Sequence, residues 1–185
     1  MSKTIYYLPG RGGQLTTGLG EGLQSRGFSV TGRETLGPFR SLTLQEQIEI
    51  ICADLQKYFW SPESRVVTVS YGAYLFLHAQ AQMQPYPGSV LLLSPIVGQF
   101  ANEEIQLGFI PPRAKRLGQL ADAGEYPEPV NSQIHVGSED WQSNPKAVTS
   151  FGTKVGIPVT IANGRGHQLG VDYVGPLLDK WLNVQ

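Results

Sequence analysis

A serine, an acidic residue and a histidine each stand shortly after a predicted strand. Ser70 follows one apolar run, Asp140 follows a second, and His167 lies in a glycine-framed loop after a third. In an open parallel sheet, ligands bind outside the carboxyl ends of the strands, so these side chains are expected to converge there. A serine activated by a histidine that an acid orients is the chemistry of acyl transfer through a covalent intermediate.

The residues around Ser70 are typical of a nucleophile on a sharp turn. The order strand, serine, helix lifts the hydroxyl above the sheet and turns the Tyr71 N–H toward a developing oxyanion. Gly72-Ala73 supplies the small residues that a close strand–helix approach requires. Ser94 also ends a strand, but Pro95 after it has no N–H to donate. The alternative interpretation of Ser70 is a helix N-cap.

The base is found by elimination among three histidines. His78 lies eight residues into the helix after Ser70 and rises about 12 Å from the turn, too far for a hydrogen bond. His135 sits inside a strand and is expected to be a core histidine with a local partner. His167 is the one that lies in a loop after a strand; the alternative is a plain loop histidine.

Two acids, Glu139 and Asp140, follow the same predicted strand. A buried carboxylate that accepts the imidazole N–H fixes the tautomer and stabilises the imidazolium. We expect Asp140 to be this acid, with Glu139 as its rival. The alternative is a solvated pair in a turn.

Apolar runs alternating with helical patterns predict an α/β fold with three layers: a mostly parallel sheet of about six strands, covered by helices on both faces. Thr43 and Glu46 form a capping box before the clearest amphipathic helix. The predicted strands are Thr4–Leu8, Phe28–Thr31, Arg65–Val69, Ser89–Leu93, Gln133–Val136 and Ile157–Ile161. The predicted helices cover 14–26, 44–59, 71–83, 144–153 and 172–182.

Composition limits the classes of function. The 185 residues fit one domain, 1–185, and the net charge of −1 excludes a strongly basic nucleic-acid binder. One cysteine, Cys52, excludes an internal disulfide, and few histidines argue against a metal cluster. The start is too poor in apolar residues for a signal peptide and no run is long enough to span a membrane. We therefore expect a cytoplasmic monomer or homodimer, without metal, membrane or nucleic-acid partners, that acts on a small molecule.

The segment 96–129 interrupts the alternation of strands and helices and shows no clear strand. Long loops in compact domains are often lids or binding loops, so a short cap is expected here. Phe100 and Phe109, together with Ser94, are the candidate lining of an acyl pocket. The cations that follow are expected to form a solvated rim: Arg113, Lys115 and Arg116.

Taken together, these motifs resemble the α/β-hydrolase fold over nearly the whole chain. Thr68-Val69-Ser70-Tyr71-Gly72 is similar to the elbow G-x-S-x-G, with threonine in place of the first glycine. This β-branched residue would crowd the contact between strand and helix. Gly137-Ser138-Glu139-Asp140 is similar to the acid loop of that fold, and Gly166-His167 to its histidine loop.

The early loop Pro9-Gly10-Arg11-Gly12-Gly13 narrows the resemblance. It is similar to that of the small, nearly lid-less serine hydrolases related to the retinoblastoma-binding serine hydrolase. Such a resemblance implies a metal-free serine hydrolase, without cofactor, acting on esters, thioesters or small amides. It also implies that this loop gives the second oxyanion N–H, from Arg11 or Gly12.

Two other functions fit parts of the sequence. Gly10-x-Gly12 after the first strand is also the start of a dinucleotide loop, and Glu34 could bind a ribose, but the third glycine position is Leu15. A catalytically silent binding protein on the same scaffold is the other alternative, since fold does not imply function.

Overall fold

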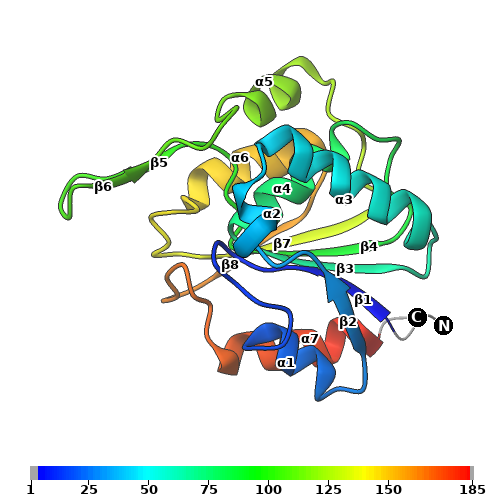
Figure 1. Cartoon of the computed structure of the whole chain (residues 1–185). Coiled ribbons are helices and arrows are strands. Elements are labelled where there is room, and N and C mark those ends of the chain that lie inside the picture. The colour runs from blue at the N-terminus through cyan, green and yellow to red at the C-terminus, as the bar shows by residue number, and fades with distance from the viewer. Residues whose placement is uncertain (1–3, 184–185) are drawn as a thin grey trace.

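The computed structural model of the protein describes residues 4–183 and contains a six-stranded sheet in which all neighbouring strands are parallel (Figure 1). The strand order is β2-β1-β3-β4-β7-β8, so the direction of winding reverses between β1 and β3. The six strands are β1 (Thr4–Leu8), β2 (Ser29–Gly32), β3 (Arg65–Val69), β4 (Ser89–Leu93), β7 (Asn131–Gly137) and β8 (Val159–Ala162).

Helices cover both faces of this sheet (Figure 1). Ile5 and Tyr7 of β1 pack toward one helical layer, whereas Tyr6 and Leu8 pack toward the other, as the alternation of a strand requires. One layer consists of α1 (Leu19–Gln24) and α7 (Val171–Asn183), and the other contains α3 (Leu44–Tyr58), α4 (Tyr71–Gln80), α5 (Arg116–Ala123) and α6 (Pro145–Val155). The predicted three-layer α/β/α fold class is confirmed.

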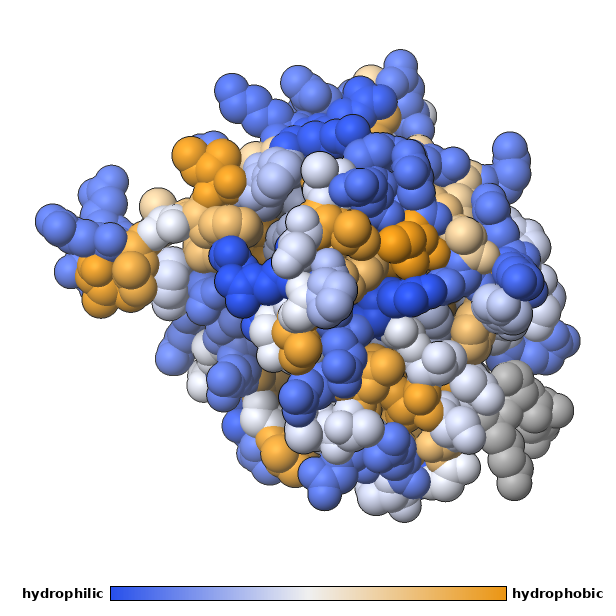
Figure 2. Space-filling model, viewed as in Figure 1, coloured by the Kyte–Doolittle hydropathy of each residue, from blue (hydrophilic) through white to orange (hydrophobic). Residues whose placement is uncertain are grey.

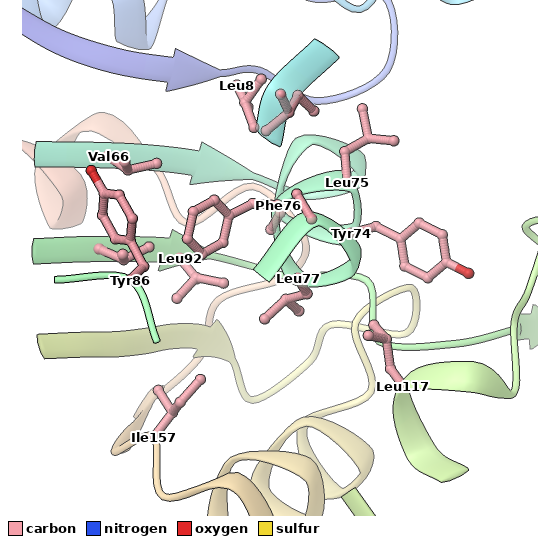
Figure 3. Close-up of a cluster of buried hydrophobic side chains, with 14 of the residues drawn as sticks. Leu8, Val66, Tyr74, Leu75, Phe76, Leu77, Tyr86, Leu92, Leu117 and Ile157 are labelled. Atoms are coloured by element: carbon pink, nitrogen blue, oxygen red, sulfur yellow. The ribbon is translucent and has the colours of Figure 1, made fainter. Parts of the chain in front are cut away.

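Helix α4 lies at the centre of the larger core cluster (Figure 3). Every residue from Gly72 to Gln80 is buried, so the helix is apolar on nearly all sides. Phe76 packs against the sheet side of the cluster with Val66 and Leu92 (Figure 3). This burial fixes the position of the helix whose first turn follows Ser70.

Near the N-terminus the observed helices differ from the predicted ones in two ways. The helix expected from residue 14 begins only at Leu19, because Gly18 has a left-handed φ of 56° and residues 9–18 form a loop instead. A short helix that was not expected, α2 (Gly37–Ser41), precedes α3. The capping box at Thr43 and Glu46 is formed as predicted.

The segment 96–129 contains structure that its sequence did not indicate. An antiparallel hairpin of β5 (Phe100–Asn102) and β6 (Leu107–Phe109) projects from the body of the molecule (Figure 1), and α5 follows it. Strands of three residues are too short to give a readable alternation, which is why the expectation of no strand was wrong.

A bilayer-spanning helix is absent from residues 4–183, since none of their helices combines the length and the apolar character needed.

His135 and His78 are both buried, at 6% and 2% exposure. His135 has the local partners expected of a core histidine: Nδ1 is 2.8 Å from the Tyr173 hydroxyl and Nε2 is 3.2 Å from Oε1 of Gln133. Burial lowers the pKa of His135 to about 4. Burial, reinforced by the charges of Arg113 and Arg116, lowers the pKa of His78 to about 4 as well.

These depressed pKa values predict a loss of stability in mild acid. A histidine that is neutral when folded but has a pKa of about 6.5 when unfolded binds its proton more readily in the unfolded chain. The free energy of unfolding should therefore be highest above pH ~6.5 and fall as the pH drops toward 4. For His78 the difference amounts to on the order of 3 kcal/mol. In denaturant unfolding of His78→Leu, the free energy of unfolding should fall less steeply with pH over this range. If it falls as steeply as in wild type, His78 is not a source of the pH dependence.

Candidate active site

Ser70 sits on a sharp turn between β3 and α4, with φ 51° and ψ −114°. This left-handed conformation is strained for a residue with a Cβ, and surrounding bonds hold it. The Ser70 N–H donates to the Leu93 carbonyl at 2.9 Å, and its carbonyl accepts the N–H groups of Tyr74 and Ile96. Gly72 lets α4 approach the loop after β1, since a Cβ there would collide with the carbonyl oxygen of Leu8.

A continuous hydrogen-bond chain joins Ser70, His167 and Asp140. The Ser70 Oγ lies 2.8 Å from Nε2 of His167, and Nδ1 of His167 lies 2.9 and 3.0 Å from the two Asp140 oxygens. With the imidazole proton on Nδ1 and directed at the carboxylate, Nε2 accepts the hydroxyl proton of Ser70. This arrangement matches the roles of nucleophile, general base and orienting acid.

The carboxylate of Asp140 is fully buried, with 0% of its side chain exposed. Its Oδ1 also accepts the backbone N–H groups of Gln142 and Ser143, at 3.0 and 2.8 Å. These donors compensate a charge that would otherwise be costly to remove from water. Glu139 is exposed, and its N–H donates to the Arg165 carbonyl, while its carboxylate has no hydrogen-bond partner within residues 4–183. Of the two acids, the structure brings Asp140 to His167.

Ser143 is a site residue that sequence reasoning missed. Its hydroxyl donates to the Ser94 carbonyl at 2.6 Å, and its Oγ lies 3.4 Å from Nδ1 of His167. The available signal was its position three residues after Asp140, a spacing at which an aspartate accepts backbone N–H groups in a turn. Ser94, expected in the pocket wall, is 1% exposed and therefore lies beneath the site rather than on its surface.

The two candidate donors of the early loop differ in the direction of their amides. The Gly12 N–H donates to the Thr35 carbonyl at 3.0 Å, so it is turned away from Ser70. The Arg11 N–H makes no hydrogen bond within residues 4–183. Tyr71, the first residue of α4, likewise has no acceptor inside its helix. Of the two loop residues, Arg11 is the one whose N–H has no hydrogen-bond partner within residues 4–183.

Aromatic side chains form a wall beside Ser70. The ring of Phe109 meets Tyr71 at 6.3 Å and Phe100 at 5.8 Å, and Phe100 meets Trp141 at 5.6 Å. The Arg11 guanidinium lies over the Phe109 ring, 5.1 Å from its centre. Sequence reasoning found Phe100 and Phe109 but missed Trp141, which directly follows Asp140.

Thr68 does not prevent the sharp turn despite its branched side chain. It is fully buried in β3, and its hydroxyl donates to the Leu91 carbonyl of the neighbouring strand at 3.5 Å. The side chain is therefore accommodated within the sheet, below the contact between strand and helix.

The early loop does not have the geometry of a dinucleotide site. Helix α1 begins at Leu19, so no helix N-terminus stands directly behind the glycines of residues 10–13. The carboxylate of Glu34, the candidate ribose ligand, accepts the Leu15 N–H at 3.1 Å. The Glu34 hydrogen bond ties the loop to the segment that follows β2, and the late start of α1 leaves these glycines without the helix N-terminus that a pyrophosphate site uses.

Comparison with known proteins identifies the fold. No protein-family model matches the chain, and no curated protein matches its sequence. Solved structures do match. The ydeN gene product from B. subtilis is 11% identical with a TM-score of 0.66, over 98% of this chain and 99% of that chain. Alpha/beta hydrolase domain-containing protein 10 from mouse is 12% identical with a TM-score of 0.67, over 97% of this chain and 89% of that chain. A carboxylesterase structure from the Thaumarchaeon Nitrososphaera gargenis also matches, with 12% identity and a TM-score of 0.66, over 98% of this chain and 89% of that chain. The chain has the α/β-hydrolase fold.

Gly137 is predicted to control the placement of His167. A Cβ at this position would overlap the backbone carbonyl oxygens of Arg165 and Gly166, in the loop that carries the histidine. Gly137→Ala should therefore push this loop outward and lower the free energy of unfolding by about 1–3 kcal/mol. The matched control is Gly118→Ala in α5, where the added methyl meets open space and should stabilise the helix by about 0.5–1 kcal/mol. Thermal unfolding of both variants measures the difference, and equal stabilities would refute the prediction.

Proposed function

We propose that this protein is a serine hydrolase that cleaves a small ester, thioester or amide through an acyl-enzyme. The observation that carries the proposal is the hydrogen-bond chain from the Ser70 hydroxyl through His167 to the buried Asp140 carboxylate. The proposal is supported by the position of these hydrogen bonds, because Ser70, Asp140 and His167 follow β3, β7 and β8 at the edge of the sheet where open parallel sheets bind ligands. Neither a metal nor a cofactor is needed for this chemistry.

Acylation begins when Ser70 attacks the substrate carbonyl. Nε2 of His167 takes the hydroxyl proton as the new C–O bond forms, and Asp140 stabilises the imidazolium. The N–H groups of Tyr71 and Arg11 are the proposed donors to the oxyanion. His167 then passes its proton to the departing alcohol, thiol or amine. A water molecule, deprotonated in turn by His167, releases the acid and restores the serine.

The surroundings of Ser70 favour a modest, uncharged acyl group. Phe109 and Phe100 supply an apolar wall that is half-buried rather than closed over the site. The base of the β5–β6 hairpin thus contributes aromatic contacts, and we propose that the segment 96–129 acts as a partial cap. A small molecule can reach Ser70 directly, because the serine and His167 are both partly exposed.

The nucleophile is tested by labelling and by turnover. A fluorophosphonate should modify wild-type protein at Ser70, as mapped by mass spectrometry, and Ser70→Ala should abolish labelling. Hydrolysis of activated short-chain esters should fall by at least about 10³-fold in Ser70→Ala, while thermal stability changes little. A catalytically silent binding protein would show neither labelling nor ester hydrolysis. Full activity in Ser70→Ala would exclude the proposed mechanism.

The orienting acid is tested by two adjacent substitutions. Asp140→Asn keeps the shape of the side chain but favours the wrong imidazole tautomer, and should lower turnover by about 10⁴-fold. Glu139→Gln is the matched control, since the Glu139 side chain is exposed, and it should cost little. Both variants are compared with wild type on the same ester. The reverse order of activities would identify Glu139 as the acid.

A further inference from the structure

The β5–β6 hairpin carries exposed apolar residues away from the body of the protein (Figures 1 and 2). Ile105 and Leu107 are 52% and 57% exposed, and Ile110 at the foot of the hairpin is 74% exposed. The two strands form a sheet of their own, and within the part of the chain that the structure describes they pair with no other strand. A two-stranded hairpin is marginally stable in water, and exposed strand edges with apolar side chains favour pairing with another chain.

The far end of this hairpin, which we call the arm tip, is acidic as well as apolar. It comprises residues 103–107, Glu103-Glu104-Ile105-Gln106-Leu107, all of them exposed. Neither Glu103 nor Glu104 forms an ion pair with any part of the chain that the structure describes. The arm tip therefore presents two negative charges beside two branched apolar side chains.

A hollow at the foot of the same hairpin has the opposite charge. We call it the root hollow; its lining is Gln99, Ile110, Pro111, Arg113, Ala114, Lys115, Arg116 and Gln119. Its three cations are exposed and make no ion pair within residues 4–183. The hairpin extends away from the body of the molecule and from α5 (Figure 1), so the arm tip of the same molecule does not neutralise these cations.

We propose that two copies of this chain form a two-fold dimer in which the arm tip of each lies in the root hollow of the other. A two-fold axis between two antiparallel β5–β6 hairpins brings each arm tip against the root hollow of the other copy. Both contacts form at once, so the assembly is closed at two copies. Each of the two contacts joins Glu103 and Glu104 to Arg113, Lys115 and Arg116. It also covers Ile105 and Leu107 with the exposed side chain of Ile110.

The size of the arm is compatible with this arrangement. Three strand residues at about 3.3 Å each, plus the turn, separate tip and root by roughly 10–15 Å. Antiparallel arms at this spacing lie side by side along their length, so their free backbone edges face each other and can add hydrogen bonds.

The proposed interface borders the candidate active site. Tyr74, whose hydroxyl donates to the Pro112 carbonyl at 2.6 Å, links the root hollow to α4, and its ring stacks on Tyr71 at 5.7 Å. Phe100 and Phe109 of the aromatic wall are the residues where the arm leaves the body. A partner's tip in the root hollow would hold this wall in place beside Ser70.

The dimer is tested by sedimentation velocity over a range of micromolar concentrations, with charge-reversed variants. The wild-type chain should dimerise reversibly, and added salt should weaken the dimer. Glu103→Lys/Glu104→Lys and Arg113→Glu/Lys115→Glu should each raise the dimer dissociation constant by at least about tenfold, because like charges then meet in both contacts. The matched controls reverse exposed charges elsewhere, Glu21→Lys in α1 and Lys180→Glu in α7, and should leave association unchanged.

Mixing the two double variants gives the sharpest result. In the mixed pair both contacts again join opposite charges, so a heterodimer should form at concentrations where each variant alone is a monomer. A wild-type chain that stays monomeric, or a dimer that resists both reversals, would overturn the proposal. A third result would also overturn it: a wild-type monomer whose unfolding temperature rises with pyrophosphate, while that of Arg113→Glu/Lys115→Glu does not. The root hollow would then be a site for a small anion. None of these measurements depends on ester hydrolysis.

Discussion

The left-handed backbone of Ser70 exists because β4 and α4 hold it from both sides. Its N–H is bound to the Leu93 carbonyl, and its own carbonyl receives two N–H groups, from Tyr74 and from Ile96. The conformation is unfavourable for serine in isolation, so the packed helix α4 and the neighbouring strand must stabilise it. The direction of the hydroxyl, and with it the contact to His167, depends on this constraint.

A second constraint is the burial of the Asp140 carboxylate. A buried charge is tolerated only where donors surround it, and here two backbone N–H groups and the imidazole of His167 provide them. The carbonyl of Ser94 extends the network through the hydroxyl of Ser143. The end of β4, which anchors Ser70 through Leu93, thereby also positions the loop of the acid.

The body and the arm of this protein follow different physical rules. Within the body, apolar residues from alternating strand positions are covered by helices, and Ser70, His167 and Asp140 meet at the carboxyl ends of the strands. The hairpin of β5 and β6 instead exposes Ile105 and Leu107 and leaves opposite charges at its two ends. A surface of this composition is better explained by an interaction with a second molecule than by the stability of the monomer.

The sequence by itself determined the strands that carry the site and the candidates on them. Long apolar runs such as Ser89–Leu93 were readable as strands, because a strand buried on both faces is almost wholly apolar. Ser70, Asp140 and His167 followed from their positions after such strands. The resemblance to hydrolases pointed to the early loop as a donor of N–H groups. It could not choose between Arg11 and Gly12, because amide direction is a property of the folded backbone.

Only the tertiary structure decided the contacts that join residues far apart in the chain. The choice of Asp140 over Glu139 depends on which side chain the turn after β7 directs inward, and two backbone N–H groups set that direction. Ser143 and Trp141 became visible only when the loop lay against His167 and Phe100. The hairpin likewise escaped sequence analysis, since strands of three residues carry too little alternation to be read. The spacing of apolar residues along a segment indicates which of its faces is buried. The distances between side chains of different segments are set only when those segments pack together.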